Sequence, residues 1–261
     1  MIPIHSIKSH YTLALAEGEG VGTAYEYYAK RLVLSPWLRQ VKRPERVLVA
    51  GLPQKYGVSL DFLLLAAELG AAVVVIDERP QAIARLQRAL AAAQAQGWLV
   101  QLDLVCRVVA SLADVTEEFD LCLSSEVLPR LAAGTRTTYV RRLQNLTPAV
   151  ALFAPNADNP LHTTLSGLSG LHRSELEALV GGRGAGEPGS RVGVTLSGYL
   201  DMPPFPPGVV RDENQRARAS SGRFEALAMW ALGYYARLEK YVPTTIRRRH
   251  SHIVYAFTRR A

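Results

Sequence analysis

Short apolar runs alternate with helical patterns through the first 155 residues of the chain. Runs rich in β-branched residues and closed by glycine or an acid are typical of buried parallel strands. They lie at 46–51, 71–80, 98–109, 119–125 and 149–155. Apolar residues at helical spacing follow the strands, in 59–70, 81–96 and 126–146. This alternation with short connections predicts an α/β fold with a doubly wound, mostly parallel sheet.

The pattern differs on both sides of this core. Residues 1–45 have a helical pattern with aromatic bias, interrupted by the glycine-rich stretch 17–22, after which Thr23 is a candidate N-cap. Beyond residue 155 we expect a short helix with the capping-box pair Ser174 and Glu177, and a strand over 191–201. We also expect a helix over 222–240 and a final strand over 252–260. With the strand over 191–201, the final strand brings the predicted sheet to seven strands.

These patterns divide the chain into four predicted regions. A helical N-terminal lid precedes a cofactor-binding core, and a substrate and lid region is inserted before the final strand. The inserted region contains a flexible stretch, 181–190, and a proline-rich stretch, 202–208. The predicted boundaries are 1–45, 46–155, 156–250 and 251–261.

Composition restricts the class of protein but does not define its chemistry. The 261 residues are 48% apolar and 20% charged, which indicates a folded domain, and no apolar run is long enough to span a membrane. The N-terminus lacks an apolar signal segment, so we expect a cytoplasmic protein with Cys106 and Cys122 reduced. The net charge of +7 is compatible with a nucleic-acid partner. However, the basic residues are dispersed except at 247–250 (RRRH), which favours a solvated surface.

Candidate chemistry lies where the predicted strands end, because ligands of open α/β sheets bind at the carboxyl edge. The stretch VLVAGLPQKYGVSL, 47–60, joins a strand to a helix through a turn whose N–H groups can bind an anion. Asp77 ends the next strand, 20 residues after Gly57, and an acid there can accept hydrogen bonds from ribose hydroxyls. Further polar groups follow the third and fourth strands, at 110–112 and 124–126.

The combined pattern resembles the class I S-adenosylmethionine-dependent methyltransferases, which have a Rossmann-like fold. The resemblance covers about residues 46–155 and the terminal strand, through RVLVAG, VVVIDERPQAIARLQRAL, EEFDLCLSSEVLPRL, AVALFAP and HIVYAFTRR. It implies that S-adenosylmethionine is the cofactor and that the last strand is antiparallel. It places the turn at the methionine moiety, Asp77 and Glu78 at the ribose, Ser111 and Leu112 near adenine, and Ser124 and Glu126 in the pocket floor.

The turn departs from the glycine-rich pattern of that family. Val49 replaces the usual acid, and Pro53 and Lys55 replace two glycines, so that only Gly51 and Gly57 match. Proline removes a backbone donor. Lys55 can compensate as a positive charge for the cofactor carboxylate, or it is simply solvated.

The acceptor side carries weaker signals. Tyr25 and Tyr28 share one helix face and either pack on the sheet or cover the cofactor, and Tyr25 is also a weak catalytic candidate. His162 and His172 flank the loop after the fifth strand and are candidate general bases. The loop that begins near Tyr199 and Asp201 and includes Phe205 is a candidate acceptor pocket, and no spacing indicates a metal site.

The sequence therefore predicts methyl transfer to a small-molecule acceptor. The first alternative is a methyltransferase-fold binding or scaffold protein without catalysis. An RNA methyltransferase, favoured only by the positive charge, and an NAD(P)-dependent oxidoreductase are weaker alternatives. We also expect that Asp77→Ala weakens cofactor binding and leaves the fold intact, because a strand-end acid contributes little to a core.

Overall fold

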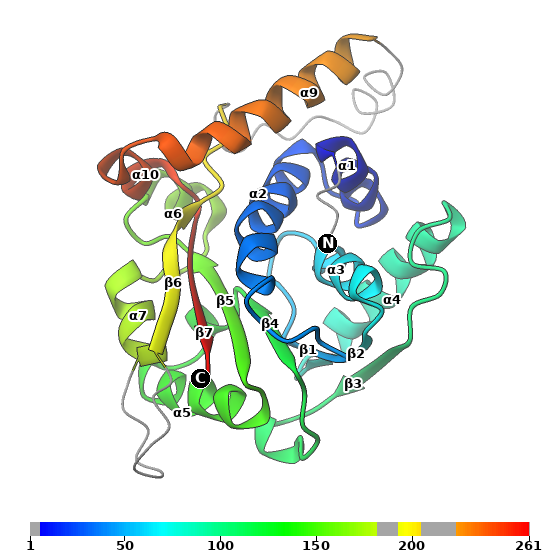
Figure 1. The fold of residues 1–261 in the computed structure, drawn as a ribbon, viewed down its shortest axis with the longest axis vertical. Coiled ribbons are helices and arrows are strands. Elements are labelled where there is room, and N and C mark those ends of the chain that lie inside the picture. Colours follow the sequence, from blue (N-terminus) through cyan, green and yellow to red (C-terminus); the bar gives the residue numbers. More distant parts are fainter. Residues whose placement is uncertain (1–5, 182–192, 205–222, 261) are drawn as a thin grey trace.

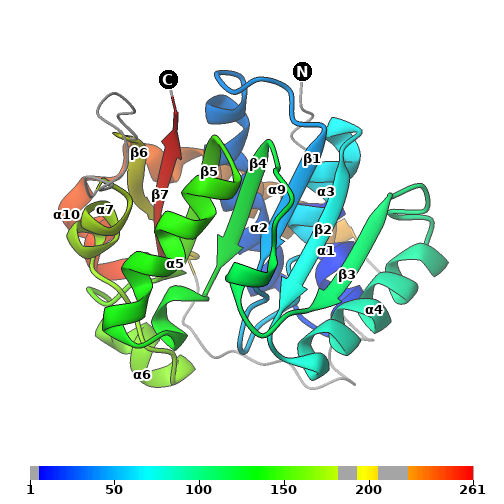
Figure 2. The same cartoon turned by 90° about the horizontal axis from the view of Figure 1, so that it is seen from below.

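The protein forms one seven-stranded, mostly parallel sheet with helices on both faces (Figures 1 and 2). The computed structural model describes residues 6–181, 193–204 and 223–260. The strands follow the order β3-β2-β1-β4-β5-β7-β6, and β7 runs antiparallel to both β5 and β6. The strands are β1 (Arg46–Ala50), β2 (Ala72–Asp77), β3 (Leu104–Val108), β4 (Leu121–Ser125), β5 (Ala149–Pro155), β6 (Gly193–Leu200) and β7 (Ile253–Arg259). The predicted fold class is confirmed, including the antiparallel final strand.

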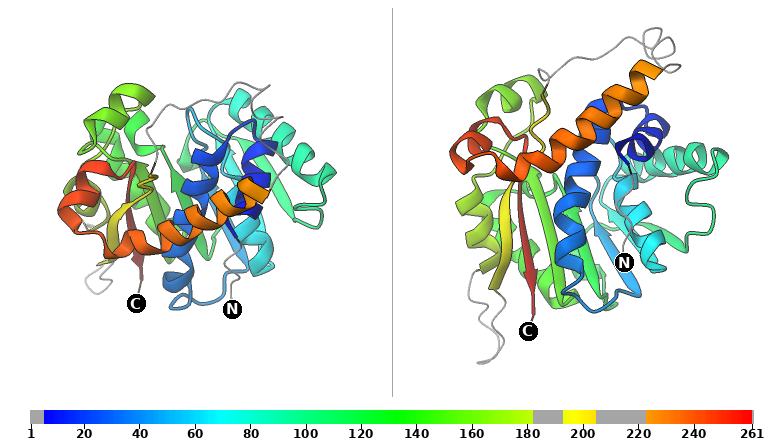
Figure 3. Two further views of the ribbon diagram at one scale, coloured as in Figure 1. Left: turned by 90° about the horizontal axis from the view of Figure 1, so that it is seen from above. Right: turned by 45° about the horizontal axis from the view of Figure 1, so that its top comes forward.

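The helices form two layers, and a further helix lies outside one of them. The core residues of α1 (Ile7–Ala16), α2 (Val21–Leu38), α3 (Leu60–Leu69) and α4 (Pro80–Ala95) pack on one sheet face. Those of α5 (Ala133–Leu146) and α7 (Arg173–Gly181) pack on the other. The helix α9 (Arg223–Leu238) crosses α1 and α2 (Figure 3). The remaining elements are η1 (Leu112–Asp114), η2 (Leu128–Arg130), α6 (Pro160–Ser166), η3 (Glu239–Tyr241) and α10 (Thr244–His250).

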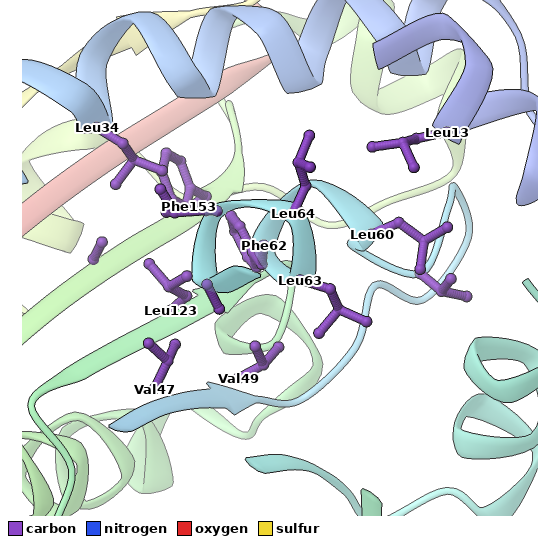
Figure 4. Close-up of a cluster of buried hydrophobic side chains, with 14 of the residues drawn as sticks. Leu13, Leu34, Val47, Val49, Leu60, Phe62, Leu63, Leu64, Leu123 and Phe153 are labelled. Atoms are coloured by element: carbon purple, nitrogen blue, oxygen red, sulfur yellow. The ribbon is translucent and has the colours of Figure 1, made fainter. Parts of the chain in front are cut away.

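Alternating side chains on each strand supply both halves of the core. Val47 and Val49 of β1 pack towards α3, where Phe62 and Leu63 are buried (Figure 4). Leu48, one residue along the strand, packs on the opposite face. A strand with both faces covered therefore has the continuous apolar run that the sequence shows.

Several predicted helix starts and strand bounds are wrong. The helix α2 begins at Val21 after Gly20, so Thr23 lies inside the helix and does not cap it. The helix α7 includes Ser174, and Glu177 instead accepts hydrogen bonds from Arg173 and Ser197. The third strand spans only Leu104–Val108. The stretch 247–250 belongs to α10, which the sequence pattern did not reveal, and the same is true of α6.

Some predicted features fall on parts of the chain for which no structure is described. The flexible stretch 181–190 lies outside the described residues except for its first residue, and the proline-rich stretch 202–208 lies outside them from Phe205 onwards. The acceptor-pocket role of Phe205 therefore stays a prediction.

Candidate functional site

The carboxyl edge of the sheet gathers most of the polar residues that the strands position. Because β7 is antiparallel, the residue before its start lies at the same edge as the residues after β5 and β6. Backbone hydrogen bonds fix this meeting point: the N–H of His252 donates to Asp201, and that of Asn156 donates to His252, both at 2.8 Å. The edge carries, in sheet order, Asp77, Gly51, Glu126, Asn156, His252 and Asp201.

Asp77 lies beside the turn after β1, as the sequence predicts, but its carboxylate is already bound. It accepts hydrogen bonds from the N–H of Leu52 at 2.7 Å and from the backbone N–H and guanidinium of Arg79 at 2.8 Å. Burial alone favours the protonated acid, but these donors outweigh it and lower the pKa of Asp77 below its usual value. Asp77 is therefore an ionised group that a ligand reaches only in competition with Arg79.

The turn itself is closed by carboxylates from elsewhere in the chain. Glu17 accepts hydrogen bonds from the N–H groups of Val58 and Leu60 at 2.5 and 2.9 Å, and Glu19 accepts one from Gly57 at 3.0 Å. Glu126 accepts one from Gln54 at 3.3 Å. Thus four backbone donors between residues 54 and 60 bind the chain's own acids.

Both matching glycines have a packing reason to be glycine. Gly51 and Gly57 have positive φ angles of 80° and 65°. A Cβ on Gly51 would collide with the side chain of Val127, and one on Gly57 would collide with Glu17 and Tyr27. Pro53 is buried between them in sequence. The structure thus explains these glycines by internal contacts as well as by the cofactor that the resemblance implies.

The remaining predicted cofactor residues make structural contacts. The ammonium group of Lys55 donates to the carbonyl of Ser166 at the end of α6. Ser111 is exposed and caps η1 by accepting from the N–H of Ala113 at 3.1 Å, while Leu112 is half-buried next to it. Both follow β3, at the predicted position.

The residues at the end of β4 separate onto different faces. The hydroxyl of Ser124 donates to the carbonyl of Ala50 at 2.8 Å and also contacts Tyr139 of α5, so Ser124 links β1 to β4. The next residue, Ser125, accepts from the buried ammonium of Lys30 at 3.1 Å. Glu126 is buried, has a φ of 60°, and burial raises its pKa to about 7.

Two arginines that the sequence did not single out complete this part of the edge. Arg79 holds Asp77. Arg130, from η2, pairs with the exposed Glu78 at 2.9 Å and also lies 3.6 Å from Asp77. The Nε and Nη2 atoms of Arg130 are buried and make no hydrogen bond to the described residues. Arg79 follows its partner Asp77 by two residues, so a local signal was present, whereas the partners of Arg130 come from β2 and the residue after it, which are distant in sequence.

A second cluster lies at the other end of the same edge. The Nδ1 atom of His252 lies 3.0 Å from a carboxylate oxygen of Asp201. The rings of His252 and His162 are stacked, with centroids 4.1 Å apart and an interplanar angle of 15°. Tyr25 approaches from α2 and donates to Glu239 at 3.0 Å. Sequence reasoning missed His252, although the antiparallel last strand implied that the residue before it reaches this edge.

The other acceptor-side candidates lie elsewhere. Tyr28 is buried between α2 and α9, where its hydroxyl accepts from Arg237 at 2.8 Å. His172 is 56% exposed and contacts Asp158 at 3.0 Å. Tyr199 also bonds Asp158, at 3.4 Å. The cluster around His252 therefore contains three of the predicted acceptor-side residues: His162, Asp201 and Tyr25. The other three lie outside it: His172, Tyr199 and Tyr28.

Comparison with known proteins supports the fold. No protein-family model matches the chain, and neither does any curated protein sequence. Among solved structures, magnesium protoporphyrin IX methyltransferase from Synechocystis PCC 6803 with bound S-adenosylhomocysteine is 12% identical, with a TM-score of 0.54 over 92% of this chain and 84% of that one. The methyltransferase domain of bacterial CtHen1 gives 12% identity and a TM-score of 0.51 over 88% and 97% of the two chains.

A third similar structure is mycolic acid cyclopropane synthase CmaA1, also complexed with S-adenosylhomocysteine. It is 11% identical, with a TM-score of 0.50 over 92% of this chain and 86% of that one. The chain thus has the fold of the class I S-adenosylmethionine-dependent methyltransferases, as its sequence pattern predicts. In the part of the chain that the structure covers, no helix is long and apolar enough to cross a membrane.

Proposed function

We propose that the protein transfers a methyl group from S-adenosylmethionine to a small-molecule acceptor. The observation that carries this proposal is the placement of an ionised, buried Asp77 next to the turn after β1, at the carboxyl edge of a sheet with this strand order. An acid in that position suits the hydroxyls of a ribose. When bound, S-adenosylmethionine would supply an electrophilic methyl group on its sulfonium.

The donors and acceptors at this edge fit such a group. The buried Nε and Nη2 atoms of Arg130 make no hydrogen bond to the described residues, and Nη2 lies close to Gly51 and 3.6 Å from Oδ2 of Asp77. Buried donors without partners destabilise a protein, so an acceptor-rich ligand at this place is expected to bind them. Asp77 and Arg130 would hold the polar part of the cofactor, and Arg79 would release Asp77 when the ligand binds.

The chain's other residues at the edge would position the acceptor. Much of the rate of a methyl transfer comes from alignment of the two reactants, which a closed site provides. The lid helix α2 is fastened to the edge through Lys30, whose ammonium donates to Ser125 of β4 at 3.1 Å and pairs within α2 with Glu26 at 2.5 Å. These contacts hold α2 over the end of β4, where it would exclude water from the reacting groups.

Calorimetric titration with S-adenosylhomocysteine tests this proposal. We expect the unmodified protein to bind it, and Asp77→Asn to weaken binding by about 10-fold or more, because each lost hydrogen bond to a charged group contributes about 1.5–3 kcal/mol. Asp103→Asn is the control, because Asp103 is an exposed acid at the opposite edge of the sheet. No heat and no thermal shift at millimolar ligand would contradict the proposal.

One observation favours the alternative of a binding or scaffold protein without catalysis. The donors of the turn between residues 54 and 60 are satisfied by Glu17, Glu19 and Glu126, so the turn is stable without a ligand. The same titration separates the two functions. An enzyme must bind S-adenosylhomocysteine, which would displace Arg79 from Asp77, whereas a scaffold protein need not bind it.

A further inference from the structure

The pair formed by His252 and Asp201 has the geometry of an oriented base. The Nδ1 atom of His252 lies 3.0 Å from Oδ2 of Asp201, so Nδ1 carries the proton and Nε2 presents its lone pair. Nε2 makes no hydrogen bond within the part of the chain that the structure describes. The paired backbones of β6 and β7 fix both residues, because His252 donates its N–H to the carbonyl of Asp201.

Asp201 is held in an unusual and buried state. Its φ is 66°, in the left-handed region, which aspartate adopts more readily than most residues with a side chain. Its side chain is 6% exposed, and Oδ1 has no hydrogen-bond partner among the described residues. A buried oxygen without a hydrogen-bond partner calls for an explanation, and a functional role supplies one. A packing role alone would not require it.

Titratable groups from four segments of the chain face the His252 ring. Burial disfavours its imidazolium, but Asp201, with Glu26 from α2 and Glu239 from η3, outweighs burial and raises the pKa of His252. His162 of α6 covers one side of the ring, and burial together with His252 lowers the pKa of His162 to about 4. His162 is therefore neutral near pH 7, while His252 is the stronger base.

A second histidine–carboxylate pair in the same chain shows the contrast. His172 lies 3.0 Å from Asp158, the same separation as in the His252 pair. However, its side chain is 56% exposed, against 15% for His252, and Asp158 is also bound by Arg248 at 2.9 Å. The His172 pair is thus a surface contact with its charge already balanced.

We infer that His252, oriented by Asp201 and flanked by His162, accepts a proton from the methyl acceptor, and that this acceptor is an un-ionised phenol or other hydroxyl compound. This inference rests on the proposed function. The acceptor's O–H bond breaks and its proton passes to Nε2 of His252. The oxygen keeps the electron pair and forms the new O–CH3 bond, while the electrons of the broken C–S bond stay on sulfur, leaving a neutral thioether and an imidazolium.

A series of phenols tests this assignment. The panel contains 4-methylphenol and catechol, which need a base because phenols ionise near pH 10, and 4-nitrophenol, which ionises unaided at mildly alkaline pH. We expect His252→Gln to lower kcat/KM for the first two by about 10²–10⁴-fold, the usual contribution of a general base. In the same His252→Gln variant, kcat/KM for 4-nitrophenol should stay within several-fold of the value for the unmodified protein. The control His172→Gln should leave kcat/KM for all three phenols unchanged.

Failure of this inference is distinguishable from failure of the proposed function. Absence of S-adenosylhomocysteine binding to the unmodified protein contradicts the proposed function. Binding of S-adenosylhomocysteine without methylation of any phenol, or equal losses for all three phenols in His252→Gln, overturns the inference.

A readout that does not depend on turnover accompanies the phenol series. NMR titration of the histidine rings should show His252 with a raised pKa that falls in Asp201→Asn. The acidic limb of kcat/KM for 4-methylphenol should move to lower pH in the same variant. An unmoved limb overturns the role of Asp201, and S-adenosylhomocysteine binding by each variant confirms that it folds.

Discussion

A single carboxylate, that of Asp77, joins the end of β2 to the turn after β1. Its side chain is wholly buried and binds Leu52 and Arg79. The expectation that Asp77→Ala leaves the fold intact is therefore difficult to sustain, because Arg79 and the Leu52 N–H lose their acceptor. We expect this variant to lose about 3–5 kcal/mol of unfolding free energy, as for other broken buried ion pairs, measured by urea denaturation.

The pH dependence gives an independent check on Asp77. Its pKa is lowered in the folded protein, so its stabilisation is present above the unfolded value of about 3.9 and is lost as pH falls through the folded value. Asp77→Asn should remove this acid-side loss, whereas the exposed Asp103→Asn should not. Equal stability of Asp77→Ala and the unmodified protein at neutral pH would contradict the structural role.

At the scale of residues, the sequence predicts the position of side chains that follow directly from the strand pattern. Asp77 and Gly51 end apolar strands, so their edge of the sheet could be predicted from periodicity alone. Arg130 and His252 could not be assigned, because their partners come from segments that are distant in sequence. Arg79 could have been, because its partner Asp77 lies two residues earlier. The resemblance places Ser124 in the pocket floor at the end of β4, but its hydroxyl contacts the carbonyl of Ala50 and Tyr139 of α5.

At the scale of elements, Glu17 fastens the loop between α1 and α2 to the start of α3. It accepts hydrogen bonds from Val58, Leu60 and the hydroxyl of Tyr27, the last at 2.6 Å. Glu17→Ala leaves buried backbone donors without partners, and we expect it to lower the unfolding free energy by about 1–3 kcal/mol. Faster amide hydrogen exchange at Val58 and Leu60 should accompany this loss.

Glu17→Gln is the matched variant, because the amide retains one acceptor oxygen in the same shape. It should lose less stability than Glu17→Ala and keep slower exchange at Leu60. If the two variants exchange equally fast, the contact of Glu17 with the N-terminus of α3 does not stabilise that helix.

The elements that the sequence missed share a physical reason. The helices α6 and α10 each have seven residues and lack a complete apolar face, so no helical period can be recognised. Residues 98–103 continue the apolar run before β3, but Leu99 has a φ of 56°, which no strand contains. The predicted third strand therefore begins six residues too early, at residue 98 instead of Leu104, because it rested on apolar composition alone.

At the scale of the molecule, the alternation of strands and helices determined the sheet. Right-handed crossovers leave few arrangements for five parallel strands with short connections, so the fold class could be predicted. The position of β6 at the sheet edge beyond β7 depends on pairings between distant segments, which no local pattern encodes. That pairing is also what brings Asp201 to His252.

The whole molecule should be most stable on the acidic side of neutrality. Burial raises the pKa of Asp61 to about 6, the pKa values of Glu68, Glu126 and Glu239 to about 7, and the pKa of Glu17 to about 8. The folded protein therefore binds these protons more tightly than the unfolded chain does. By linkage, these groups make stability fall as pH rises from about 4.5 through about 8.

Glu239 is the sharpest probe of this slope. One of its oxygens accepts from Tyr25 at 3.0 Å and from the N–H of Met202 at 3.3 Å, while the other has no partner among the described residues. Glu239→Gln keeps an acceptor for both donors and cannot ionise, so urea denaturation between pH 5 and pH 8 should show a shallower loss, by about 1–3 kcal/mol. The exposed Glu118→Gln should retain the original slope. A rise in stability across this interval in the unmodified protein would show that the buried carboxyls are ionised throughout, with Lys30 and Arg31 balancing them, and the raised pKa values would then be wrong.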